Sequence, residues 1–308
     1  MSEAEKSASP PPENRRKRGG ARVVYRFAVL ALVFAPIAFA FWASRKSQPH
    51  YQGRSLTAWL DELSSGQFED RARATNAIRA IGTNALPVLL ALLREEDSLP
   101  ASRFIDFLRR QSFLRLGLRH PSERYGQVAL GFRVLGPLAA PAGPELERIL
   151  TNGPARISAA FCLATIGPDN LPIFLRGLDS LDPDTLMGSI AAIAELHKAA
   201  QPAAPKLLRL AQARDPRVRR LALFTLGNIG PDPSNAVPLF ISCLRDGDSR
   251  VRVQAAHALG VLGPRARSAT PALLPLLSDP LLEVRSEAAE ALRVIEPEAA
   301  RRAAEKAE

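Results

Sequence analysis

Apolar residues recur along the C-terminal two thirds of the chain at the 3.6-residue spacing of one buried helix face. The clearest stripe consists of Val218, Ala222, Thr225, Leu226 and Ile229. A glycine and a proline follow it and end the helix, because glycine allows a left-handed residue and proline cannot continue the helix. A second apolar stretch, rich in leucine, comes after this stop. The pattern therefore predicts helical hairpins, each with an Ala-rich first helix and a Leu-rich second helix.

The hairpins repeat at a nearly fixed period. Residues 217–231 and 250–264 share eight identities over fifteen aligned positions. The first helices are predicted to stop at Gly82, Gly136, Gly167, His197, Gly230, Gly263 and Glu296, at intervals of 54, 31, 30, 33, 33 and 33 residues. A period of this size indicates a solenoid, in which each unit buries its apolar face against its neighbours. We predict six to seven units, with one insertion between the first and the second.

Aspartate and proline mark the predicted helix starts. Asp182, Asp215 and Asp248 stand 33 residues apart, and Asp279 follows after 31; all but Asp248 precede a proline. Aspartate is a good N-cap and proline a favourable first helical residue. The second helices are predicted to begin at Pro87, Pro172, Pro205, Pro238 and Pro271.

A short helix is predicted ahead of the repeats. Behind Ser55, a good N-cap, Leu56, Trp59, Leu60 and Leu63 form one apolar stripe. The first unit of a solenoid has an open face that another element must cover. We expect this helix to be that cover, with contact between Trp59 and a partner as the alternative.

The N-terminal region carries a membrane signal. Residues 27–43 contain no charge, and together with residues 23–26 they approach the ~20 residues that cross a ~30 Å hydrocarbon core. Six Lys or Arg residues lie within residues 15–26, and only three follow between residues 44 and 54, so the positive-inside bias keeps the N-terminus cytoplasmic and the repeats extracytoplasmic. Two alternatives stay open: signal cleavage near Ala40, which would export a soluble protein, and a buried helix of a soluble protein.

These signals give the following domain boundaries. They are 1–22 for a disordered basic cytoplasmic tail, 23–44 for the transmembrane helix or signal anchor, 45–54 for a short linker, 55–300 for the solenoid with an insert near 95–123, and 301–308 for a polar tail.

The net charge of +10 suggests nucleic acid at first sight, but it is concentrated near the N-terminus. Residues 1–54 hold ten Lys and Arg against three acids, whereas the remaining residues hold 31 against 28. The two tryptophans, Trp42 and Trp59, precede the repeats, so the solenoid lacks both a strong basic footprint and tryptophans for base stacking. We therefore expect no nucleic-acid partner.

The sequence contains no arrangement that marks an enzyme. It has no phosphate-binding glycine loop, no nucleophile elbow and no His, Cys or acidic residues at metal-ligand spacing, so we expect no cofactor, no metal site and no small-molecule substrate. Cys162 and Cys243 fall within helical patterns two repeats apart, and we interpret both as buried small hydrophobes.

The repeated pattern resembles a known family. Asp-x-x-Val-Arg-x-x-Ala-x-x-Ala-Leu-x-x-Leu-Gly-Pro, followed by Ala-x-Pro-x-Leu-Leu, is similar to the short bacterial HEAT repeat, including the type first described in phycobilisome lyases. The resemblance covers roughly residues 67–300 and implies an all-α, right-handed solenoid. It also implies that an arginine pairs with the turn aspartate four residues earlier, as Arg219 would with Asp215 and Arg252 with Asp248. The arginine column consists of Arg71, Arg156, Arg219, Arg252 and Arg285.

The one long interval contains our candidate partner-binding site. The surplus residues lie within 94–124 and hold several phenylalanines and arginines, side chains that dominate interface hot spots. The candidate residues are Arg103, Phe104, Phe107, Arg109, Arg110 and Arg115. The alternative is that the phenylalanines form an apolar stripe and the insert is a helix that fills the gap between units.

Together these patterns predict a non-enzymatic, membrane-anchored scaffold that binds or organises another protein through the concave face built by the second helices. Two alternatives remain. One is an accessory subunit or lyase-type enzyme component built on HEAT repeats, and the other is a nucleic-acid-binding HEAT-like protein.

Overall fold

The structure is a computed structural model that describes residues 48–65, 67–94, 121–153 and 155–305. The chain divides into two compact units, residues 1–50 and 51–308, and almost all described residues belong to the second. The predicted tail and membrane helix at 1–44, and most of the predicted insert, lie outside the described residues.

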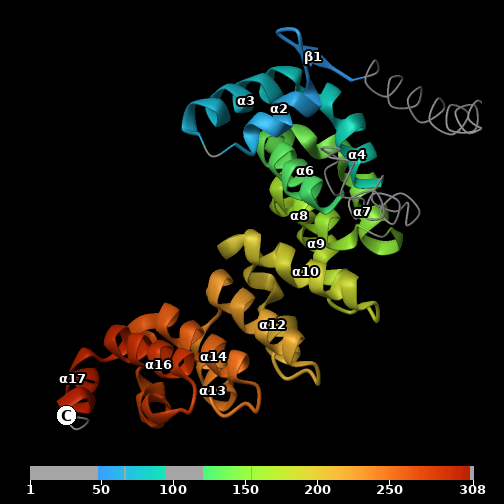
Figure 1. The fold of residues 1–308 in the computed structure, drawn as a ribbon. Coiled ribbons are helices and arrows are strands. Elements are labelled where there is room, and N and C mark those ends of the chain that lie inside the picture. Colours follow the sequence, from blue (N-terminus) through green and yellow to red (C-terminus); the bar gives the residue numbers. More distant parts are fainter. Residues whose placement is uncertain (1–47, 66, 95–120, 154, 306–308) are drawn as a thin grey trace, which may run out of the picture. The chain divides into compact units, whose positions relative to one another are not determined.

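The described residues of the second unit form seven helical hairpins, which confirms the predicted all-α solenoid (Figure 1). The first helices are α3 (Phe68–Ile81), α6 (Pro121–Leu135), α8 (Arg156–Ile166), α10 (Pro183–Glu195), α12 (Pro216–Ile229), α14 (Ser249–Leu262) and α16 (Leu282–Ile295). The second helices are α4 (Leu86–Arg94), α7 (Gly143–Asn152), α9 (Leu171–Gly177), α11 (Ala204–Leu210), α13 (Pro233–Cys243), α15 (Thr270–Leu273) and α17 (Pro297–Glu305). The last helix, α17, takes in most of the stretch predicted as a polar tail.

Short 3-10 turns connect the first helix to the second helix within most of the hairpins, a feature that the periodicity did not predict. They are η1 (Gly82–Ala85), η3 (Gly136–Ala142), η4 (Pro168–Asn170), η5 (His197–Ala203) and η6 (Gly263–Ala269), and η7 (Leu274–Ser278) extends the sixth second helix. The stop residue begins each of η1, η3, η5 and η6 and directly precedes η4, and in all five its φ is positive, as the glycine column requires. His197 occupies this column with φ +49°, so the backbone keeps the turn even where glycine is replaced.

Successive first helices lie side by side, from α6 to α16, and one hydrophobic core runs through the stack. All five residues of the α12 stripe are buried, as predicted. Close approach depends on small residues. A Cβ added to Gly260 of α14 would lie 3.3 Å from the Cα of Ala291 in α16, whereas one added to Gly227 of α12 would lie 3.9 Å from the Cα of Ala258.

The predicted N-caps hold in three units and fail in one. Asp182, Asp215 and Asp248 accept a hydrogen bond from a backbone N–H in the first turn of α10, α12 and α14. In the seventh unit the N-cap residue is Leu281, two residues after Asp279, so the prediction for Asp279 was wrong. The reason is register, because Asp279 stands 33 residues after Asp246 and not after Asp248.

One second helix also begins earlier than predicted. Asp232 caps α13 through the N–H of Ser234, so that helix starts at Pro233 and contains Pro238 in its second turn. This unit has two prolines that could begin the helix, Pro233 and Pro238. The helix begins at Pro233, because that proline follows an N-cap residue.

Helix α2 (Leu56–Leu63) covers the first unit, which confirms that prediction. Its four apolar residues are buried against α3 and α6. Trp59 is 4% exposed, and its indole N–H donates to the carbonyl of Tyr51 at 3.2 Å. Tyr51 belongs to a two-residue strand, β1 (His50–Tyr51), which pairs with β2 (Arg54–Ser55).

One described stretch, Phe68–Arg94, is long and apolar enough by length and composition to cross a membrane. It comprises α3, η1 and α4 and buries Ile78, Leu89 and Leu93 in the solenoid core. We therefore interpret it as the first hairpin of the solenoid.

Candidate protein-binding surface

The arginine column links each unit to the next. The guanidinium of Arg219 donates to both carboxylate oxygens of Asp246, from Nε and Nη2, each at 2.7 Å. Its Nη1 donates to the carbonyls of Ala213 and Arg214, each at 2.9 Å. Arg219 therefore joins the loop before α12 to the loop before α14.

The same arrangement recurs one unit later. Arg252 donates to both oxygens of Asp279 at 3.0 Å and to the carbonyl of Asp246 at 2.9 Å. In the third unit Arg156 pairs with Asp182 at 3.0 Å. The partners of Arg219 and Arg252 were predicted to be the preceding turn aspartates, and that prediction was wrong, because those aspartates cap their own helices.

The electrostatics of these pairs indicate a structural role. Burial of Asp246 opposes its ionisation, but hydrogen bonds from Arg219 and from the N–H of Asp248 outweigh burial and hold the pKa of Asp246 below its usual value. Hydrogen bonds from Arg252 and from the N–H of Leu281 lower the pKa of Asp279. Because these guanidiniums are occupied by carboxylates and carbonyls, this part of the column is a stacking ladder and not an anion-binding stripe.

Two adjoining hollows lie over the second helices of units four to six. One, of about 440 Å³, is formed by α11, the stop after α12 and the start of α13, and the other, of about 500 Å³, by α13 and η6. The residues that line both are Pro233 and Arg265. Aliphatic and proline side chains predominate, among them Leu208, Val237 and Ile241. We call the two hollows together the second-helix groove.

Arg265 lies where the two hollows of the second-helix groove meet. It is exposed, its Nε donates to the carbonyl of Leu262 at 3.4 Å, and it forms no ion pair with any described residue. An arginine among apolar side chains is a common composition for an interface hot spot. The sequence predicted the second helices as the binding face but did not single out the lining residues of the groove, for which Pro233, at the start of α13, was a possible signal.

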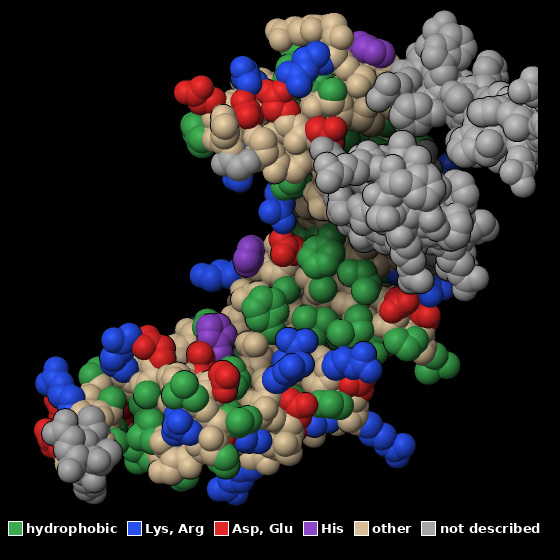
Figure 2. All heavy atoms as spheres, in the orientation of Figure 1, with side chains coloured by type: hydrophobic (Ala, Val, Ile, Leu, Met, Phe, Trp, Pro, Cys, Tyr) green, Lys and Arg blue, Asp and Glu red, His purple; other side chains and the backbone are tan. Residues whose placement is uncertain are grey.

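The first helices carry an exposed apolar region as well. Figure 2 shows hydrophobic side chains gathered over α8 and α10, whereas charges of both signs lie scattered over α12 to α16. Ile157 of α8 is 43% exposed and Phe224 of α12 is 41% exposed. Apolar surface of this kind is typical of interaction sites.

The six residues of the predicted insert site, at positions 103–115, lie outside the described residues, and their role stays a prediction.

Within the described ranges, no group of three or more His, Cys, Asp or Glu residues could hold a metal ion. Cys162 and Cys243 are buried, as predicted, and burial raises the pKa of both thiols.

The described chain is thus a helical-repeat solenoid. A comparison with family models finds that residues 204–293 are similar to HEAT repeats. No curated protein sequence matches the chain.

Solved structures of similar fold include an engineered protein, which is 22% identical, with 81% of this chain and 71% of that chain covered and a TM-score of 0.47. They also include Kap121p bound to Nup53p and Kap121p bound to Pho4p, each 14% identical with a TM-score of 0.55. These two alignments cover 82% of this chain and 30% of Kap121p. At this identity the likeness to Kap121p shows the fold alone.

Proposed function

We propose that this protein is a membrane-anchored helical-repeat scaffold that binds or organises another protein on the extracytoplasmic side. The observation that carries the binding role is the second-helix groove, which combines a mostly apolar lining with one exposed arginine at the junction of its two hollows. A protein partner suits this composition, because large apolar and arginine side chains contribute most of the binding energy at interfaces.

The structural neighbours support a protein partner by analogy. In two of them Kap121p is bound to another protein, Nup53p or Pho4p. The role is non-enzymatic in this proposal, since the scaffold acts by holding a partner and not by chemistry of its own.

The membrane anchor in this proposal is residues 23–44. Its support is the uncharged run at 27–43 and the excess of Lys and Arg before it. The insert near 95–123 would provide a second contact with the partner through its arginines, for which the support is its departure from the repeat period.

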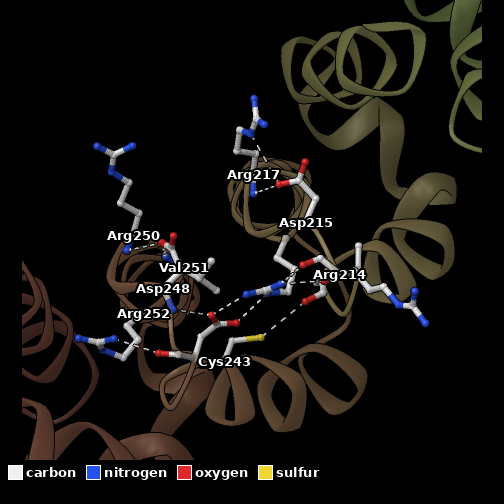
Figure 3. A network of polar contacts seen from close by, with 12 residues as sticks. Arg214, Asp215, Arg217, Cys243, Asp248, Arg250, Val251 and Arg252 are labelled. Atoms are coloured by element: carbon white, nitrogen blue, oxygen red, sulfur yellow. Dashed lines mark hydrogen bonds and ion pairs between the residues drawn. The ribbon is translucent and has the colours of Figure 1, made fainter. Parts of the chain in front are cut away.

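Proximity labelling in the native cell tests the binding role. The variant Arg265→Glu reverses the one charge at the junction of the hollows. A matched control is Arg250→Glu in α14, because Arg250 is also exposed and its side chain points away from the neighbouring polar network (Figure 3). We expect Arg265→Glu to lose a set of labelled proteins that Arg250→Glu keeps, with unchanged melting. The same labelled set in both variants would refute the groove as the binding surface.

A further inference from the structure

The first helices of units one and two carry arginines at a position where units three to six have alanine or glycine. The position lies three residues before each stop and holds Gly227 and Gly260 in units five and six. There it allows close helix contact, with Gly260 against Ala291 as the tightest case. In units one and two the same position holds Arg79 and Arg133. Long side chains cannot fit such a contact, so the helices of these units cannot pack in the same way.

A hollow of about 510 Å³ opens at this point, between α3 and α6 and beside the end of α2. Its cationic side chains are Arg71 and Arg79 of α3 and Arg133 of α6. Leu63, Leu130 and Val134 supply aliphatic surface, and one serine and one threonine complete the lining. No carboxylate lines this hollow, which we call the arginine hollow.

The acids near the arginine hollow already have partners. Glu62 pairs with Arg54 and Arg73, and Asp70 also pairs with Arg73. Glu195 of α10 pairs with Arg133 at 3.2 Å, an exposed contact that contributes little energy. Within the described residues, these ion pairs leave Arg71 and Arg79 of α3 without a carboxylate partner.

Among the described residues, Arg71 and Arg79 have few hydrogen-bond partners for their guanidiniums. Arg71 donates from Nε to the carbonyl of Ser65 at 2.8 Å, and Arg79 forms no ion pair with a described residue. Arg71 belongs to the ladder column, but the position that supplies Asp246 and Asp279 in later units is Arg119 in the sequence of the second unit. The second unit therefore has no acid at that position of the sequence.

The spacing of these charges matches an extended chain. Arg71 and Arg79 are eight residues apart on α3, which is a rise of about 12 Å. In an extended segment, side chains four residues apart point to the same side and lie about 13 Å apart. An apolar side chain midway between two such carboxylates would face Leu130 and Val134.

We propose that the arginine hollow binds an extended acidic segment of a partner protein, with two carboxylates four residues apart and an apolar residue between them. Charge complementarity selects the acidic chain. No aromatic side chain that could stack on a base lines the hollow, which disfavours single-stranded nucleic acid. This site is separate from the second-helix groove and does not depend on it.

The test measures the binding of a fluorescent peptide, Ser-Gly-Glu-Ser-Leu-Ser-Glu-Gly-Ser, to the full chain. The anisotropy of the peptide's fluorescence reports binding. Comparison peptides are its glutamine analogue and an isomer with adjacent glutamates. The variants are Arg79→Gln alone, which removes no described contact of the fold, and Arg71→Gln with Arg79→Gln. Arg265→Gln and Arg250→Gln are controls with matched charge, and phosphatidylglycerol vesicles test the membrane as a competing occupant.

We expect saturable binding of the spaced-glutamate peptide that weakens with added salt. It should weaken about tenfold in the double variant, partly in Arg79→Gln, and not in either control. Three outcomes would overturn the proposal. The first is no saturable binding up to millimolar peptide. The second is loss of binding in Arg265→Gln instead, which would assign the acidic peptide to the second-helix groove. The third is loss of vesicle binding with unchanged peptide binding in the arginine variants.

Discussion

Arg219 of α12 and Asp246 of the loop before α14 form a two-bonded ion pair that crosses from one repeat unit to the next, with both N···O distances at 2.7 Å. The side chains are 18% and 12% exposed, so the pair is shielded from most of the solvent. The contact fixes the register between units, because each arginine donates hydrogen bonds both to carbonyls in the loop of its own unit and to an aspartate of the following unit.

The first prediction concerns this pair. Asp246→Ala should lower the free energy of unfolding by about 1.5–3 kcal/mol, since it leaves a shielded guanidinium without its charged partner. Asp215→Ala, which removes a helix N-cap and an exposed ion pair with Arg217 at 3.7 Å, should cost about 1 kcal/mol, because an exposed pair contributes little. Urea unfolding measures both. A larger cost for Asp215→Ala would contradict the inter-unit pairing.

The second prediction is a pH dependence. The folded-state pKa values of Asp246 and Asp279 lie below their ordinary values, so these groups bind protons more weakly in the folded than in the unfolded chain. Their contribution to stability is present above the unfolded pKa of about 3.9 and is lost as the pH falls further through the folded pKa values. Glu145 is expected to contribute to stability with the same pH dependence, because hydrogen bonds from Arg148 and Arg94 lower its pKa to about 2.

Urea unfolding between pH 5 and pH 2 checks this dependence. Stability should fall with pH in the wild type and fall less steeply in a variant with Asp246→Asn and Asp279→Asn. An equal slope in both proteins would mean that these carboxylates are not the groups responsible.

The third prediction compares two glycines of equivalent position. Gly227→Ala should raise the melting temperature, because alanine favours the helix by about 1 kcal/mol and its Cβ meets ordinary contacts at 3.9 Å. Gly260→Ala gains the same propensity, but its Cβ at 3.3 Å from the backbone of Ala291 pushes α14 and α16 apart. Calorimetry should show the first variant melting above the second. The reverse order would refute the close packing of α14 on α16.

The fourth prediction concerns topology. With the excess of Lys and Arg ahead of residue 27, a reporter fused after Glu308 that matures only outside the cytoplasm should be active. The protein should also remain in the membrane fraction after a carbonate wash. Reporter activity confined to the cytoplasm would overturn the orientation, and full extraction of a chain that lacks residues 1–40 would favour signal cleavage.

The fifth prediction concerns the insert. In the compact unit 51–308, replacing Arg109, Arg110 and Arg115 together by Ser should abolish partner capture and leave melting unchanged. Replacing Phe104 and Phe107 by Ala should lower melting if these side chains pack. Unaltered capture in the arginine variant would leave the insert with a packing role only.

Local patterns in the sequence determined the helices and their order. The buried stripe on α12, the caps at Asp215 and Asp248, and the cover formed by α2 were all predictable, because each depends on neighbours within a few residues or on a period that the chain repeats. Even the exchange of glycine for His197 did not disturb the predicted stop. These features need no knowledge of how the units meet.

Contacts between units were decided by the tertiary structure. The sequence contains two aspartates before α14, and only the stacking register shows that Asp246 meets Arg219 while Asp248 caps the helix. Likewise, Arg79 and Arg133 are ordinary helix residues in the sequence, and a hollow forms between them only because α3 and α6 are packed as neighbours. The physical reason is that a hydrogen bond or a close contact between units forms or fails when the distance between its atoms changes by a few tenths of an ångström. A local periodicity in the sequence does not specify distances to that precision.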